Sequence, residues 1–108
     1  MLAEIEAIAV RNRIEVGTFG HAGDGNLHPT FVLDRDEADA AVPRLEAARV
    51  ELYEAALRLG GTVTGEHGIG VARRDWLVRQ RGPEAVEVMR SIKRALDPRG
   101  LLNPGRML

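Results

Sequence analysis

The sequence predicts an α+β fold with a small, mainly antiparallel sheet and helices on one face of that sheet. Apolar residues recur at helical spacing in several segments of the 108-residue chain, and between residues 14 and 33 they alternate with a period of two. Inside that alternating segment, Asp24 and Gly25 form a strong turn dipeptide. Together these observations favour a hairpin of two strands among several helices.

The N-terminal third of the chain supplies the first helix and the hairpin. Apolar residues at helical spacing predict a helix over residues 2–12. Strands over about residues 14–21 and 27–33 are expected to follow, with a glycine-rich turn between them. Pro29 has no backbone N–H, so we expect it at an edge position or at a bulge of the second strand.

The middle of the chain predicts a long helix and a third short strand. An apolar stripe runs from Leu45 to Leu59, and Gly60-Gly61 follows it as a helix stop. Pro43 suits the first turn of this helix, where its missing N–H would be unpaired in any case. The residues before Pro43 are expected to form a short helical lead-in, and residues 62–64 are expected to form the strand.

Two more helices and a tail are predicted to complete a single domain over residues 1–108. The helices are expected over residues 72–80 and 83–96, and the tail follows a turn after the second of them. The sequence has no repeats and no low-complexity linker that would divide it. Four side chains of the last helix are expected to point inward: Val86, Met89, Ile92 and either Leu96 or Ala95.

Composition argues against several kinds of partner. The formal net charge is −1 and aromatic residues make up 4% of the chain, so neither a basic surface nor a base-stacking platform for nucleic acid is expected. Without cysteine there are no disulfides and no thiolate metal sites. No apolar run approaches the roughly 20 residues that span a bilayer, and no signal peptide is recognisable. A cytoplasmic location is expected.

The stretch GHAGDGNLH, residues 20–28, groups two histidines and one acid among glycines and is the first candidate for a functional site. If its flanks pair as a hairpin, His21 and His28 flank the turn symmetrically as cross-strand partners, with Cβ atoms roughly 4.5–5.5 Å apart. Imidazoles at that spacing can reach one metal ion at about 2.0–2.1 Å each. Asp24 is expected to shape the turn by bonding to its own backbone. Spacing alone also allows the alternative that the two histidines are surface side chains of the hairpin with no metal.

The stretch GEHGIG, residues 65–70, holds a second pair of chemical groups. Glu66 could complete a two-histidine, one-carboxylate set that suits zinc, manganese or iron and keeps positions open for substrate. His67 would then lie unligated beside the metal as a neutral general base. Neither stretch matches a dinucleotide-binding or phosphate-binding glycine pattern.

Three motifs in order, GHAGDGNLHP, GEHGIG and DPRGLLNPGR, resemble the C-terminal part of FAD-linked 2-hydroxy-acid dehydrogenases. This family includes D-lactate dehydrogenases, glycolate oxidase flavin subunits and D-2-hydroxyglutarate dehydrogenases. The resemblance runs from about Ile14 to Arg106. It implies part of a ferredoxin-like α+β domain and the oxidation of a small 2-hydroxy acid to a 2-oxo acid by hydride transfer to FAD.

The resemblance also implies roles for individual residues. His21, His28 and Glu66 match the positions that bind a divalent cation in the metal-dependent members, and His67 matches the base that takes the substrate hydroxyl proton. Asn26, Asn103 and Arg106 match positions near the flavin. Arginine at 106 departs from the usual lysine.

The resemblance covers only the last quarter of such an enzyme. No flavin-binding domain is present in the sequence, so FAD would be held mainly by that domain, in cis or in trans, and the chain by itself is expected to be inactive. Exposed apolar surface could also favour a homo-oligomer, and the full enzyme could lie peripherally at a membrane. Two alternatives stay open: an independent metalloenzyme (an iron oxygenase or a zinc hydrolase), and a non-catalytic interaction module.

Overall fold

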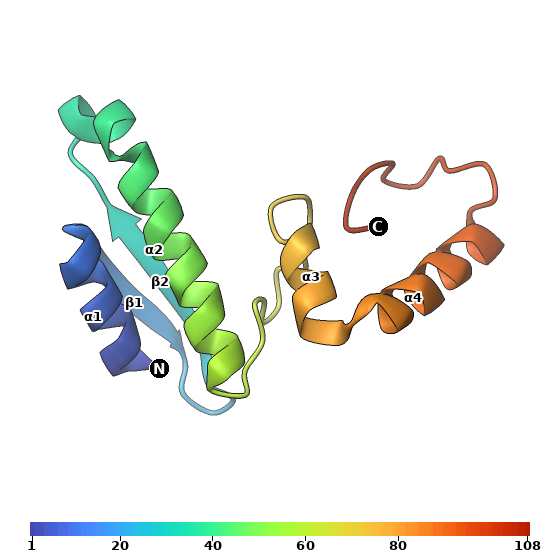
Figure 1. The fold of residues 1–108 in the computed structure, drawn as a ribbon, viewed down its shortest axis with the longest axis horizontal. Helices are drawn as coiled ribbons and strands as arrows, with labels where there is room; N and C mark the ends of the chain where they lie inside the picture. Colours follow the sequence, from blue (N-terminus) through green and yellow to red (C-terminus); the bar gives the residue numbers. More distant parts are fainter. The chain divides into compact units, whose positions relative to one another are not determined.

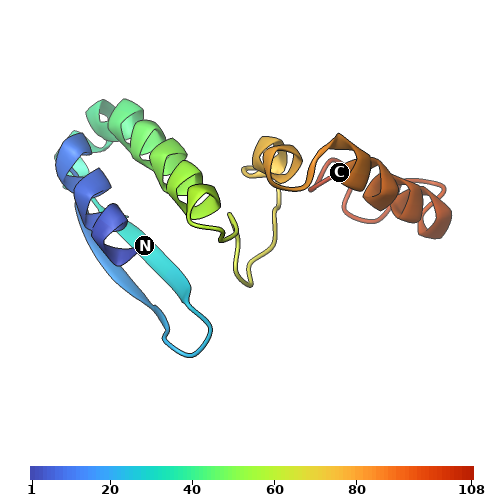
Figure 2. The same cartoon turned by 60° about the horizontal axis from the view of Figure 1, so that its bottom comes forward.

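The computed structural model describes residues 1–108, apart from the side chain of residue 38. The chain folds as two compact units, residues 1–65 and residues 66–108 (Figures 1 and 2). The helices and the antiparallel strands give an α+β arrangement, as the sequence predicts. Among the helices described, none is both long enough and apolar enough to cross a membrane.

The first unit is a β-hairpin with two helices. The strands β1 and β2 form a two-stranded antiparallel sheet, and the helices α1 and α2 pack on one face of it (Figure 2). A short 3-10 helix, η1, leads into α2. The elements of this unit are α1 (Leu2–Asn12), β1 (Glu15–His21), β2 (Asn26–Val32), η1 (Arg35–Glu37) and α2 (Ala38–Arg58).

The core of the first unit lies between the helices and one face of the hairpin. Its buried members come from α1, α2 and the residue before β1: Ile5, Ile8, Ile14, Ala48, Leu52 and Ala55. Val16, Leu27 and Phe31 of the strands pack against this cluster. Because neighbouring residues on a strand point to opposite faces, Phe19, His21 and His28 belong to the face turned away from the core.

The second unit contains α3 (Arg74–Arg81), α4 (Pro83–Leu96) and an irregular C-terminal tail. Trp76 and Leu77 of α3 and Val86 of α4 are its buried apolar helix residues. The Arg79 guanidinium lies over the Trp76 ring, 4.3 Å from its centroid. The tail returns to the start of the unit, where the Met107 N–H donates to the Gly70 carbonyl at 2.9 Å.

The bounds of α1 and α4 confirm the sequence predictions, and both strands lie within one residue of their expected ends. The strand expected over residues 62–64 is wrong, because this segment is irregular. Thr62 explains why: its Oγ1 donates to the Thr64 carbonyl at 3.2 Å and accepts from the Thr64 N–H at 3.5 Å. These local bonds compete with strand pairing.

Two predictions about helices also need correction. Pro43 lies inside α2, which begins at Ala38, and not in its first turn. Near the helix start its missing N–H costs a single bond, to the Asp39 carbonyl. Ile92 and Leu96 point outward and are 56% and 77% exposed. They follow the helical period, yet no described residue of the second unit covers them.

Substitution of Ile8 by alanine tests the core of the first unit. Ile8 is 1% exposed, so Ile8→Ala should lower the free energy of unfolding by about 2–5 kcal/mol through lost burial and a cavity. Val10→Ala on the same helix is the control, since Val10 is 77% exposed and surface changes stay within about 0.5 kcal/mol. Urea unfolding followed by the hairpin amide signals measures both. Equal effects would show that Ile8 is not a core residue.

Candidate metal centre

The turn between β1 and β2 is built by Asp24. Its Oδ1 accepts the Asn26 N–H at 2.9 Å, and the Gly25 N–H donates to the His21 carbonyl at 3.0 Å. Gly25 has a φ of 73°, which glycine adopts without strain. The predicted bonding of Asp24 to its own backbone neighbourhood is therefore confirmed, and it closes the loop over residues 22–25.

This turn sets a register that differs from the expected one. His21 pairs with Asn26, and His28 pairs with Phe19, so the two histidines are diagonal neighbours on one face of the hairpin. The expectation that they are direct cross-strand partners is wrong, because the tight turn pairs His21 with the first residue of β2. Diagonal neighbours are still within reach of long side chains. Their ring centroids lie 5.6 Å apart, edge to face.

Phe19 completes the aromatic group on this face. Its ring stacks on the His28 ring with centroids 5.2 Å apart and an angle of 21° between the planes. Phe19 is exposed and His28 is half-buried. The stacking holds the His28 imidazole beside His21, so the strand register and the Phe19 ring together set where the two imidazoles lie.

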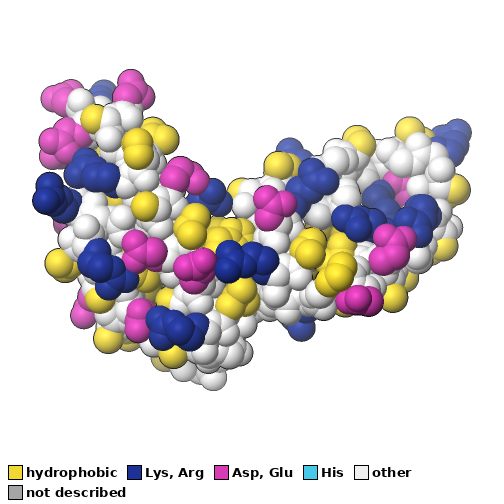
Figure 3. Space-filling view, viewed as in Figure 1, with side chains coloured by type: hydrophobic (Ala, Val, Ile, Leu, Met, Phe, Trp, Pro, Cys, Tyr) yellow, Lys and Arg dark blue, Asp and Glu magenta, His cyan; other side chains and the backbone are white. Residues whose placement is uncertain are grey.

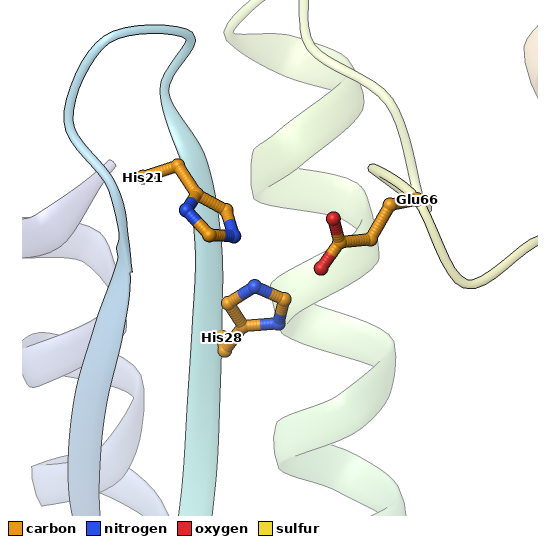
Figure 4. A group of neighbouring side chains, drawn as sticks. All are labelled: His21, His28 and Glu66. Carbon is orange, nitrogen blue, oxygen red and sulfur yellow. The ribbon is translucent and has the colours of Figure 1, made fainter.

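Glu66 brings a carboxylate to the two histidines. One ligand atom from each of His21, His28 and Glu66 lies within 4.8 Å of the others (Figure 4). Glu66 is bonded to Gly65, the last residue of the first unit, so its backbone begins where that unit ends.

Two nitrogen donors and one carboxylate suit zinc, manganese or iron with open coordination positions. Atoms bound to one ion at about 2.1 Å lie no more than about 4.2 Å apart. Modest side-chain rotations would therefore close the group around an ion. His21 and Glu66 are exposed, so such rotations meet little resistance.

His67 lies next to the carboxylate. Its Nε2 is 3.4 Å from Glu66 Oε1, and both side chains are exposed. Two left-handed glycines, Gly68 and Gly70, shape the loop that follows, and the Arg73 guanidinium donates to the Gly68 carbonyl at 3.3 Å. The geometry thus places an imidazole beside the candidate carboxylate ligand, just before a loop that Arg73 contacts.

The three residues expected near a flavin lie in different places. The Asn26 side chain lies against the backbone of Gly65 on the histidine face of the hairpin. Asn103 and Arg106 belong to the tail of the second unit, where the Arg106 N–H donates to the Asn103 carbonyl at 3.2 Å. Both tail residues are exposed.

Asp97 organises this tail, where the sequence pattern predicts only a turn. Its Oδ1 accepts the Leu101 N–H and its Oδ2 the Leu102 N–H, both at 2.9 Å, and Lys93 Nζ donates to Oδ2. Lys93 and these backbone donors lower the pKa of Asp97 to about 2. The Asp-Pro that follows the helical period of α4 is the signal that could have identified this capping carboxylate.

Comparison with known proteins identifies the family. The sequence profile of FAD linked oxidases, C-terminal domain, matches residues 1–107. The chain is 46% identical to a protein named glycolate oxidase subunit GlcD of Bacillus subtilis, over 99% of this chain and 23% of that protein. It is 44% identical to a probable mitochondrial D-lactate dehydrogenase of Danio rerio, over 100% of this chain and 22% of that protein.

A third relative has a further substrate name. The chain is 34% identical to a D-2-hydroxyglutarate dehydrogenase of Stutzerimonas stutzeri, over 98% of this chain and 24% of that protein. The chain belongs to the family of FAD-linked oxidase C-terminal domains, as its motifs indicate. It spans less than a quarter of the length of these relatives.

The low pKa of Asp97 predicts a pH-dependent tail. The carboxylate stabilises the tail fully above its ordinary pKa of 3.8, and this contribution is lost as the pH falls through about 2. The amide signals of Leu101 and Leu102, followed by NMR on acidification, should therefore move with a midpoint near 2. Asp97→Asn is the control and should remove this step. A wild-type midpoint near 3.8 would contradict the prediction.

Proposed function

We propose that this chain is the substrate-binding and metal-binding C-terminal domain of an FAD-dependent dehydrogenase of small 2-hydroxy acids, of the D-lactate or glycolate type. The carrying observation is the convergence of His21, His28 and Glu66 from two separate segments. Family membership and the names of the relatives support the reaction class. The whole-protein activity is part of the proposal, since the chain covers only a fraction of those proteins.

The donor set fits a divalent cation. Held by His21, His28 and Glu66, zinc, manganese or iron would supply a Lewis acid for the carboxylate and hydroxyl oxygens of the substrate and for developing negative charge. The exposure of His21 and Glu66 gives the substrate access to the open side of this group. No thiolate competes for the metal, because the chain has no cysteine.

His67 is the proposed general base. Its imidazole takes the proton of the substrate hydroxyl, and the Cα hydrogen leaves as a hydride, so the 2-hydroxy acid loses two electrons and two hydrogens and becomes the 2-oxo acid. FAD, bound mainly outside this chain, would accept the hydride. The 3.4 Å separation between His67 Nε2 and Glu66 Oε1 supports this role, because it keeps base and ligand side by side.

A flavin-binding domain, in cis or in trans, is the proposed partner. Val88, Ile92 and Leu96 follow one another at intervals of four on α4, so they share one face of the helix, and all three are exposed. Figure 3 shows hydrophobic side chains open to solvent between charged ones over α3 and α4. Asn26, Asn103 and Arg106 are the residues proposed to contact the flavin once the domains have assembled.

Metal analysis tests the proposed centre. The wild-type chain should bind one Zn²⁺ or Mn²⁺ in isothermal titration. His21→Ala, His28→Ala and Glu66→Gln should each lose more affinity than the roughly 10–100-fold that a change outside the ligand set costs. His67→Ala is the matched control and should keep the metal with no more than that smaller loss, because His67 lies beside Glu66 and is the base in this proposal, not a ligand. Loss of binding only in His67→Ala would show that the ligand set is wrong.

Activity assays test the need for a flavin partner. The purified chain should show no flavin absorbance and should not oxidise D-lactate or glycolate, because the hydride has no acceptor. Addition of the flavin-binding part of a relative should restore turnover with the wild type, whereas His67→Ala should stay inactive. Turnover by the chain without flavin would overturn the proposal, and iron-dependent oxygen uptake would favour an independent oxygenase.

A further inference from the structure

The residue before Glu66 makes an unusually close contact. A Cβ added to Gly65 would lie 2.1 Å from Oδ1 and 2.5 Å from Cγ of Asn26. Real Cβ atoms essentially never approach heavy atoms below 3.0 Å. Only a hydrogen atom therefore fits between the Gly65 backbone and the Asn26 amide group. Both residues belong to the first unit, so the contact is internal to it.

Asn26 occupies the middle of the histidine face. It is the direct strand partner of His21 and lies two residues before His28, on the same face of β2. Its backbone N–H is bonded to Asp24 Oδ1, and its side chain is half-buried. The turn thus fixes the base of this side chain beside both imidazoles.

The segment that carries Glu66 is not part of a strand. After α2, the Gly61 N–H donates to the Ala56 carbonyl at 2.8 Å, and Val63 is buried in the first unit. Thr64 and Gly65 then lead to Glu66. Since Val63 is three residues away from Glu66, the contact of Gly65 with Asn26 is the nearer constraint on where the glutamate side chain starts.

We propose that Asn26 and Gly65 form a seat, a close contact of the two residues that positions Glu66 against His21 and His28. Both are positioning residues here, and neither is a ligand. The inference rests on the proposed metal-binding function. A methyl group at residue 65 must displace the Glu66 segment or the half-buried Asn26 side chain, because Cγ as well as Oδ1 stands in its way.

Zinc titration of glycine-to-alanine variants tests the seat. Gly65→Ala should weaken Zn²⁺ binding by roughly 10–100-fold, as changes that misorient a ligand do. Gly23→Ala is the matched control and should bind like the wild type, because a Cβ there meets nothing within 4 Å in the same hairpin. Asn26→Ala removes the same contact from the side of β2 and should also weaken Zn²⁺ binding, because nothing then holds the Gly65 backbone against the hairpin.

The outcomes separate the seat from the metal site. Equal Zn²⁺ affinity of Gly65→Ala and wild type would overturn the seat and leave the metal site intact. Equal Zn²⁺ affinity of Asn26→Ala and wild type would likewise overturn it. If the wild type binds no Zn²⁺, the proposed function fails, and the seat is then judged on the metal-free chain.

In the metal-free chain, the seat predicts nuclear Overhauser contacts between the Gly65 Hα atoms and the Asn26 side-chain amide. Their absence would overturn the seat without reference to any metal. The hairpin amide signals report whether each variant is folded. Should Gly65→Ala fail to fold, Asn26→Gln enlarges the same contact from the other side and should weaken Zn²⁺ binding in its place.

Discussion

The register of the β1–β2 hairpin is the constraint on which the candidate site depends. Leu27 and Phe31 pack toward the helices, and residues of opposite parity are turned to the other face. A slip of one residue would move the apolar residues out of the core and bring the two histidines into it. Burial of ordinary apolar side chains therefore keeps both imidazoles on the accessible face.

The two faces of the hairpin have different roles, which explains why the candidate ligand residues need little burial. The inner face carries the packing of the first unit, with Ile5 and Ile8 almost fully enclosed. The outer face carries His21 and His28, which add no buried charge to the core. A polar group in the core would cost several kcal/mol without partners, so chemistry on the outer face leaves the fold undisturbed.

Local signals in the sequence predicted most elements. The amphipathic period of α4 and the proline at its start are sufficient to predict where this helix begins and ends. The dipeptide Asp24-Gly25 is sufficient to predict the turn between the strands. The histidine register was not predictable in the same way, because it depends on hydrogen bonds inside the loop. The segment around Val63 has β-branched residues yet forms no strand, because composition does not determine whether a neighbouring strand is there to pair with.

The candidate site, too, could be predicted only in part from the sequence. The motifs indicated which residues to consider, and the resemblance to a known family supplied their roles. Neither indicated that Asn26 touches Gly65, because that contact joins residues far apart in the sequence. The exposure of Ile92 and Leu96 could not be predicted for a similar reason. Periodicity identifies the apolar face of a helix, but it does not show whether another part of the chain covers that face.

The two-stranded sheet has one further consequence, for how the domain behaves in solution. Each strand of a lone hairpin has one neighbour only, so a row of backbone donors and acceptors faces outward on both sides. Pro29 removes one donor from β2, which interrupts that row. The remaining unpaired backbone groups can bond to a strand of a second copy of the chain. Such self-association increases with protein concentration, so dilute solutions favour the monomer.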